Sequence, residues 1–145
     1  IHQLILKNID DDNAGRYRQQ NVLISGATTT PPDYTLLNDK MAPFVDWYNT
    51  EADQLHAIER AAKVHADFVG IHPFIDGNGR TSRLLMNLEL MKAGYPPCVI
   101  KVENRLAYYE ALDQWMAHGK TEPFVQLVAD AVLEGFKPYQ LVLGI

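Results

Sequence analysis

Apolar residues recur along most of the chain at the spacing of a helix. Between Leu36 and Asn49 they stand mostly three or four positions apart, as in a helix with one buried face. These residues are Leu37, Met41, Phe44, Val45 and Tyr48. Similar patterns predict helices over residues 54–69, 78–93, 105–118 and 122–136, and residues 1–9 are interpreted as the end of another helix. The pattern therefore predicts an all-α fold.

The helix expected over residues 78–93 is apolar around most of its circumference. Its large apolar residues are Leu84, Leu85, Met86, Leu88, Leu90 and Met91. A helix that is apolar on most sides is usually buried. We therefore expect this helix in the centre of the domain, and we expect Gly94 and Pro96 to end it.

One short segment departs from the helical pattern. A β-like run from Val22 to Ile24 is followed by the turn signal Ser25-Gly26 and by residues 27–30. Two prolines at positions 31 and 32 prevent further strand pairing. We predict a small β-hairpin here, as the one exception to the helical architecture.

Length and composition place these elements in one globular domain. The chain has 145 residues, of which 47% are hydrophobic and 21% charged, and this is ordinary for a single soluble core. No apolar run approaches the roughly 20 residues of a membrane span, so we expect no membrane contact from this segment. The formal net charge of -5 argues against a nucleic-acid partner. An anionic ligand would have to be held by local charges.

The cysteine content says little about the compartment. Cys98 is the only cysteine, so an internal disulfide is excluded, but neither an oxidising nor a reducing compartment follows. We expect the cytoplasm and keep the lumen of the endoplasmic reticulum as the alternative. The chain starts without a methionine or a signal-like segment, and we interpret it as a piece of a longer protein.

Candidate chemistry is concentrated in IHPFIDGNGRTSRLLMN, residues 71–87. A helix whose first turn is Gly77-Asn78-Gly79 offers unpaired backbone N–H groups, and glycine lets an anion come close to the backbone. Arg80 and Arg83 are three residues apart and share one helix face with Asn87. Two neighbouring guanidinium groups repel unless an anion lies between them. The segment therefore predicts a polyphosphate site.

Two further residues of the segment suggest catalysis. Asp76 is a lone carboxylate beside the phosphate site and fits Mg²⁺, although alone it would more often be a helix cap. His72, with an unperturbed pKa near about 6.5, is the group of the loop that can take up a proton at neutral pH. We therefore predict His72 as a general base. Phe74, between a proline and Ile75, is expected to anchor the loop in the core.

Two other classes of function remain open from the residues. His65 lies seven residues before His72 and could join it and Asp76 in a metal-dependent hydrolase. His65 also lies in an apolar stripe, where a hydrogen-bonded core histidine is the commoner role, and a hydrolase leaves both arginines unexplained. The second alternative is a noncatalytic nucleotide-binding module. It would bind ATP whether or not His72 is present.

The stretch HPFIDGNGRTSR, His72 to Arg83, resembles the signature H-x-F-x-D/E-G-N-G-R-x-x-R of the Fic family and matches it completely. The likeness extends to GRYR at residues 15–18, to the expected hairpin and to the pair Tyr108-Tyr109. It covers nearly the whole chain, and its nearest branch is that of the chaperone-modifying Fic protein of the endoplasmic reticulum and its bacterial relatives. The resemblance implies a helical bundle in which the hairpin forms a flap beside the active site.

The resemblance also implies an activity, transfer of AMP from ATP to a Ser, Thr or Tyr hydroxyl of a target protein with release of pyrophosphate. By motif match, His72 deprotonates the hydroxyl and Asp76 binds Mg²⁺. The phosphate oxygens are expected to contact Gly77, Asn78, Gly79, Arg80 and Arg83. The intact GNGR favours AMP, while relatives that transfer phosphocholine or phosphate leave other groups open.

The resemblance implies that the target protein pairs with the flap in an extended conformation. The flap residues are Val22, Leu23, Ile24, Ser25, Gly26, Ala27 and Thr28. Relatives of this branch usually carry an Asn after the Tyr pair that reaches the adenine, whereas residues 115–119 here read WMAHG. Tyr109 is therefore the better candidate to line the adenine pocket. A homodimer is left open.

The autoinhibitory segment S/T-x-x-x-E-G/N of many relatives is not found in this sequence. Glu134 and Gly135 match its last two letters, but Asp130 stands where the first Ser or Thr is required. We interpret this partial match as coincidence and expect the segment to precede Ile1. Without it, nothing in the chain would compete with ATP for Arg83, and constitutive activity is expected.

Overall fold

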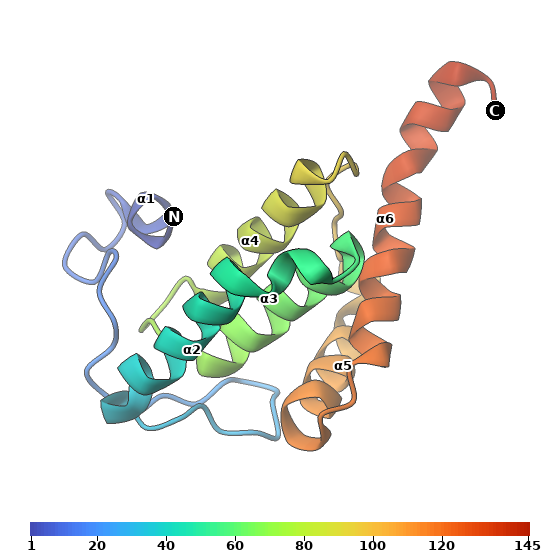
Figure 1. The fold of residues 1–145 in the computed structure, drawn as a ribbon. Helices are drawn as coiled ribbons and strands as arrows, with labels where there is room; N and C mark the ends of the chain where they lie inside the picture. The colour runs from blue at the N-terminus through green and yellow to red at the C-terminus, as the bar shows by residue number, and fades with distance from the viewer.

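The computed structural model describes all residues, 1–145, as a helical bundle without a β-strand (Figure 1). The helices are α1 (His2–Leu6), α2 (Leu37–Thr50), α3 (Ala57–Ile71), α4 (Asn78–Lys92), α5 (Arg105–His118) and α6 (Glu122–Leu143). Three 3-10 helices are η1 (Tyr34–Leu36), η2 (Ala52–Gln54) and η3 (Val102–Asn104). The prediction of an all-α fold is confirmed. None of these helices combines the length and the hydrophobicity that crossing a membrane requires.

Helix α3 is the element around which the others are arranged, since α2, α4, α5 and α6 all pack against it (Figure 1). Its small residues Ala61, Ala62 and Ala66 are completely buried. Small side chains let neighbouring helices approach closely, so larger apolar residues of α4, α5 and α6 can fill the space between them. This places the end of α3, and therefore His72, on a rigid support.

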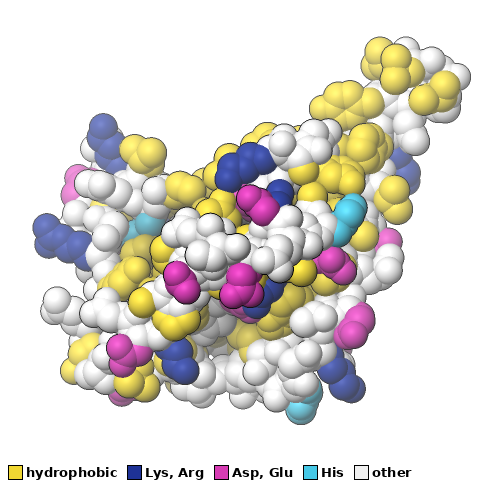
Figure 2. All heavy atoms as spheres, viewed as in Figure 1, with side chains coloured by type: hydrophobic (Ala, Val, Ile, Leu, Met, Phe, Trp, Pro, Cys, Tyr) yellow, Lys and Arg dark blue, Asp and Glu magenta, His cyan; other side chains and the backbone are white.

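The boundaries of three helices differ from the sequence pattern, and the first of them, α1, ends at Leu6 rather than near residue 9. Helix α3 begins at Ala57 rather than near residue 54, because residues 52–54 form η2 and the His56 ring accepts a hydrogen bond from the backbone N–H of Ile58 at 3.3 Å. Helix α6 continues to Leu143, although its predicted end was residue 136. Hydrophobic side chains gather on this last part of α6, which projects from the bundle (Figures 1 and 2).

The prediction that α4 is buried on most sides is wrong in part. Met86 and Leu90 are buried, but Leu84, Leu88 and Met91 are 51%, 37% and 51% exposed. Polar residues occupy much of the buried side instead. These are Asn78, Thr81, Ser82 and Glu89. The hydrophobic pattern alone did not predict which residues of α4 are buried, because polar side chains that form hydrogen bonds can also be buried inside a protein.

The predicted β-hairpin is also not formed as a pair of strands. Residues 20–33 make an extended loop that turns at Ser25-Gly26, where the N–H of Ala27 donates to the carbonyl of Ile24. The base of this loop is closed by a side-chain hydrogen bond and not by backbone pairing between strands. The Asn21 amide donates to the Asp33 carboxylate at 2.8 Å. A two-stranded hairpin is marginal by itself, so these contacts decide its shape. We keep the name flap for residues 22–28.

A buried carboxylate links α2, α3 and α4. Glu89 is only 3% exposed, and its Oε1 accepts hydrogen bonds from the Tyr48 hydroxyl at 2.5 Å and from Lys92 Nζ at 2.9 Å. Its Oε2 lies 2.9 Å from Nε of Arg60. Burial raises the pKa of Glu89, but these donors and positive charges outweigh burial, so the pKa is lowered. Glu89 is therefore ionised in the folded protein at neutral pH.

We predict that Glu89→Gln destabilises the fold by about 3 kcal/mol, because the mostly buried Arg60 loses its buried counter-ion and Lys92 loses a salt bridge. Urea unfolding of both proteins at pH 7 measures the change. The matched control is Glu134→Gln, which removes an exposed carboxylate paired with Lys101 and Lys137 and should change stability little. Equal losses in both variants would contradict the assigned role of Glu89.

The same interaction has a pH dependence with a defined sign. Because the folded-state pKa of Glu89 lies below the usual 4.5, its contribution is complete above about pH 4.5 and is lost as pH falls through the lowered pKa. The difference in unfolding free energy between wild type and Glu89→Gln should therefore shrink on acidification.

Candidate active site

The N-terminus of α4 presents free hydrogen-bond donors. The backbone N–H groups of Gly77, Asn78, Gly79 and Arg80 donate to no other group of the chain, and the first backbone bond of the helix runs from Thr81 N–H to the Gly77 carbonyl. Helix N-termini attract anions through such N–H groups and the helix dipole. The structure thus provides the local positive potential that the acidic chain otherwise lacks.

The two glycines of this turn have different reasons to be glycine. Gly77 has φ +80°, and a Cβ there would lie 3.1 Å from Nε2 of His2. A Cβ on Gly79 would lie 3.4 Å from Nη1 of Arg83. The first glycine permits the left-handed backbone, and the second leaves room for the guanidinium group of Arg83.

Asn78 fixes the loop before α4 with its side chain. Its Oδ1 accepts from the Phe74 N–H at 2.9 Å, and its Nδ2 donates to the Phe74 carbonyl at 2.8 Å. Asn78 is 2% exposed, and both ends of its amide are bonded to the backbone of the loop. Asn78 can therefore offer a ligand only its backbone N–H. Phe74 is 7% exposed and packs with Phe68 and Met41, which agrees with its expected anchoring role.

Arg80 and Asp76 form an ion pair on the open side of the turn. Nη2 of Arg80 lies 2.8 Å from Oδ2 of Asp76, and the side chain of Asp76 is 69% exposed. No group of three or more His, Cys, Asp or Glu residues is placed to hold a metal. Mg²⁺ commonly binds one carboxylate together with phosphate oxygens and water, so Asp76 fits this ion only when a polyphosphate is present.

Arg83 connects two hollows of the surface. One, of about 240 Å³, extends from His72 to Arg80 along the turn. The other, of about 190 Å³, is lined by Tyr109 and Arg105, whose guanidinium carbon lies 5.6 Å from the centre of the Tyr109 ring. Because Arg83 lines both, a ligand that contacts it can extend from the α4 N-terminus toward Tyr109.

Asn87 does not point into this site, although it lies on the helix face of Arg80 and Arg83. Its Nδ2 donates to the carbonyls of Arg83 and Cys98, and its Oδ1 accepts from the Cys98 N–H at 2.7 Å. The amide therefore fastens the link after α4 to the helix. Periodicity placed Asn87 on the correct face but could not show what its side chain contacts.

His72 ends α3 in a left-handed conformation, with φ 51° and ψ 57°. Such a backbone is unusual for a residue other than glycine and needs support from its surroundings. The ring Nδ1 lies 3.1 Å from the Val69 carbonyl, which accepts only from a protonated nitrogen. The neutral ring therefore carries its free lone pair on Nε2. Burial lowers the pKa of His72, so this neutral form prevails at pH 7.

His65 takes no part in a metal site. The residue is completely buried, its Nε2 lies 2.9 Å from the Tyr108 hydroxyl, and its ring packs on Phe124. Burial lowers the pKa of His65 to about 3. A hydrogen-bonded core histidine is what the structure contains, and the metal-dependent hydrolase of His65, His72 and Asp76 is contradicted.

Sequence analysis missed the role of Arg18, which ties the flap loop, residues 20–33, to His72 at the end of α3. The side chain is 4% exposed, and its Nε donates to the carbonyl of His72 at 2.9 Å. Its two terminal nitrogens donate to the carbonyls of Gln20 and Pro32, one at each end of the flap loop. One guanidinium group therefore sets the position of the flap relative to His72. Only the GRYR likeness drew attention to this residue.

His2 was missed as well, and it supports the turn from the other side. Its ring stacks on Phe74 with centroids 3.5 Å apart, Nδ1 accepts from the Gly15 N–H, and Nε2 donates to the Asp76 carbonyl at 2.8 Å. The residue lies in α1, far from the motif in sequence. No local sequence pattern predicts such a contact.

The flap reaches across to α5. The N–H of Thr28 lies 3.1 Å from both carboxylate oxygens of Asp113, and the side chain of Leu23 is 82% exposed. No strand pairs with residues 22–28, so most of their backbone groups are free for another chain.

Comparisons with known proteins agree with this geometry. The family model described as Fic/DOC family matches residues 1–90. Protein adenylyltransferase Fic of Drosophila willistoni is 44% identical over 131 residues, which are 90% of this chain and 26% of that protein. The protein of the same name from Nematostella vectensis is 45% identical over 130 residues, 89% of this chain and 30% of its own length. The chain thus spans about a quarter to a third of these relatives.

Solved structures give the same result. A fragment of Fic-1 from C. elegans superimposes with a TM-score of 0.84 at 38% identity, covering 99% of this chain and 42% of that one. A Fic domain containing signaling protein from Bacteroides thetaiotaomicron gives 0.73 at 32% identity, covering 84% and 52%. From the family match and these likenesses, the chain belongs to the Fic/DOC family.

Proposed function

We propose that this chain transfers AMP from ATP to a hydroxyl group of a target protein. The observation that carries the proposal is the joint placement of three features at one helix start. Four free N–H groups lie with the side chains of Arg80 and Arg83 around one hollow, and His72 stands beside them with a free Nε2. Relatives that are 44% and 45% identical are named protein adenylyltransferase, which supports this reading.

The proposed reaction follows from these positions. Nε2 of His72 removes the proton of the target hydroxyl, and the hydroxyl oxygen forms a bond to the α-phosphorus of ATP. The bond from this phosphorus to the bridging oxygen breaks, and pyrophosphate leaves with the electron pair. The free N–H groups, Arg80 and Arg83 neutralise the charge that grows on the leaving group. When bound, Mg²⁺ adds positive charge at the phosphates and would be held by Asp76.

We further propose that the flap holds the target and that Tyr109 lines the place of the adenine. The free backbone groups of residues 22–28 can pair with an extended segment of target, which would present a hydroxyl to His72 without reading much sequence. The hollow beside Tyr109 adjoins Arg83, so a nucleotide whose phosphates contact Arg83 would place its base there.

His72→Ala should abolish AMP transfer while leaving ATP affinity nearly unchanged, because the residue removes a proton and is not required for phosphate binding. Intact-mass analysis after incubation with Mg²⁺ and ATP measures AMP on the chain or on added proteins, and calorimetry measures ATP binding. Wild-type activity should fall as pH decreases through the lowered pKa of His72, below about 6.5. ATP binding without any AMP product in the wild type would instead support the noncatalytic module.

Arg83→Ala should weaken ATP binding and slow transfer together. Loss of a charged hydrogen bond to phosphate corresponds to about 1.5–3 kcal/mol, or roughly 10- to 150-fold in affinity. Arg16→Ala, at an exposed position of the loop after α1, serves as the matched control. If ATP affinity were the same in both variants, Arg83 would lie outside the nucleotide site.

Arg18→Lys should reduce transfer to a protein target much more than it reduces ATP affinity. Lysine keeps the charge but cannot donate simultaneously to the carbonyls of His72, Gln20 and Pro32 in the planar geometry of arginine. We expect a rise in KM for the target of at least about tenfold. A variant that unfolds would lose ATP binding as well, so retained ATP affinity with normal target KM would refute this role.

A further inference from the structure

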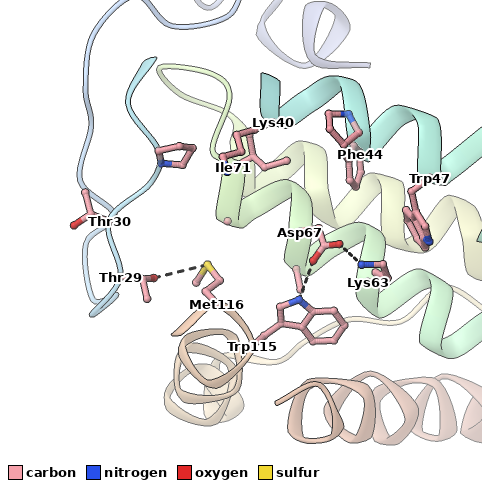
Figure 3. A pocket seen from close by; sticks show the side chains of 14 residues that line it. Thr29, Thr30, Lys40, Phe44, Trp47, Lys63, Asp67, Ile71, Trp115 and Met116 are labelled. Atoms are coloured by element: carbon pink, nitrogen blue, oxygen red, sulfur yellow. Dashed lines mark hydrogen bonds and ion pairs between the residues drawn. The ribbon is translucent and has the colours of Figure 1, made fainter. Parts of the chain in front are cut away.

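A second cleft adjoins the phosphate site at the end of α3 and shares no lining residue with it; Figure 3 shows this cleft. Its volume is about 780 Å³, and its walls come from α2, α3, the end of α5 and the returning part of the flap loop. We call it the aromatic cleft, after Phe44, Trp47 and Trp115, which line it. All three rings are partly exposed, so they offer apolar surface to an occupant.

An ion pair holds the rings of the aromatic cleft in place. Asp67 accepts a hydrogen bond from Nε1 of Trp115 at 2.8 Å and from Nζ of Lys63 at 2.6 Å (Figure 3). The same Nζ lies 4.7 Å from the centre of the Trp47 ring. Both tryptophans are thus fixed before any ligand arrives, which lowers the entropy lost on binding.

The charges of the cleft favour a particular occupant. Lys63 and Asp67 neutralise each other, whereas Lys40 lines the cleft and forms no ion pair. One positive charge therefore remains beside three aromatic rings. No helix N-terminus points into the cleft, and a single lysine is a poor polyphosphate site. An aromatic side chain with a carboxylate nearby fits better than a nucleotide.

The location of the cleft connects it to the proposed reaction. Its lining includes Gly70 and Ile71, the residues immediately before His72, and also Thr29 and Thr30 of the flap loop. In an extended peptide, side chains two residues apart point the same way and are separated by roughly 6.6 Å. A target segment along the flap that presents its hydroxyl to His72 would therefore place a neighbouring side chain in the cleft.

We propose that the aromatic cleft is a specificity pocket for the target protein, which takes an aromatic side chain two residues from the modified hydroxyl and prefers an acidic residue two positions beyond the aromatic one. This inference rests on the proposed function, since it names the target sequence that the AMP transfer would select. The flap supplies backbone pairing without sequence preference, and the cleft supplies the preference.

The test uses acetylated nonapeptides with a single threonine in a glycine and asparagine background. Phenylalanine or alanine stands two residues before or after the threonine, and glutamate or lysine stands two residues beyond the phenylalanine or alanine, so that all three side chains point the same way. AMP incorporation is followed by mass spectrometry at several peptide concentrations. Binding without ATP is followed by tryptophan fluorescence, which reports directly on the cleft because both tryptophans of the chain line it.

We expect the phenylalanine peptides, in one of the two registers, to exceed the alanine peptides at least tenfold in kcat/KM, with glutamate better than lysine. Trp47→Ala should bring the phenylalanine-to-alanine ratio close to one, and Lys40→Glu should reverse the preference for glutamate. Lys120→Glu, an exposed lysine outside the cleft, is the matched control and should keep the wild-type ratios. Each ratio is internal to one variant, so a change in overall activity does not disturb it.

Several outcomes would overturn the proposal. Equal rates for phenylalanine and alanine peptides would do so. So would a preference for phenylalanine that survives Trp47→Ala, or a preference for glutamate that survives Lys40→Glu. If ATP changed the tryptophan fluorescence and displaced the phenylalanine peptide, the cleft would be assigned to the nucleotide. Phenylalanine-dependent fluorescence with no AMP on any peptide or on the chain would instead reject the proposed function and retain the cleft as a peptide site.

Discussion

The connection between α3 and α4 must reverse the chain within residues 72–77, and it does so with His72 and Gly77 in left-handed conformations. A backbone of this kind persists only where its surroundings fix it. Arg18 holds the carbonyl of His72, His2 holds the carbonyl of Asp76, and the side chain of Asn78 spans the turn. The free N–H groups at the start of α4 depend on this support, because without it the turn could not aim them at one point.

The same support relates the active site to the region around it. Arg18 contacts both ends of the flap loop as well as the catalytic loop, so the proposed surface for the target and the proposed base are placed by one side chain. Asp67 orders Trp115 directly and Trp47 through Lys63, in a cleft whose lining reaches Gly70 and Ile71, just before His72. The polar hollow proposed for phosphates and the aromatic cleft therefore adjoin at the end of α3, where His72 stands.

Buried polar groups explain where hydrophobic periodicity failed. Helix α4 packs through Ser82, Asn78 and Glu89, while Leu84 and Leu88 remain partly in solvent. The carboxylate of Glu89 finds partners on α2 and α3, and such partners are invisible in a local pattern. The flap shows the reverse error. Its β-like residues are present, but side chains from outside the segment close it, so no ladder forms.

The sequence by itself determined the helical class and the positions of most helices, and it predicted the residues proposed for the phosphate site, because helical spacing and the GNGR turn are local properties of the chain. It could not determine what the distant residues do. Arg18 reaches His72 across 54 positions and His2 reaches Asp76 across 74, and Trp47 meets Trp115 in one cleft only after α2, α3 and α5 have packed. Those contacts are fixed by packing geometry rather than by local preference, so only the tertiary structure decided them.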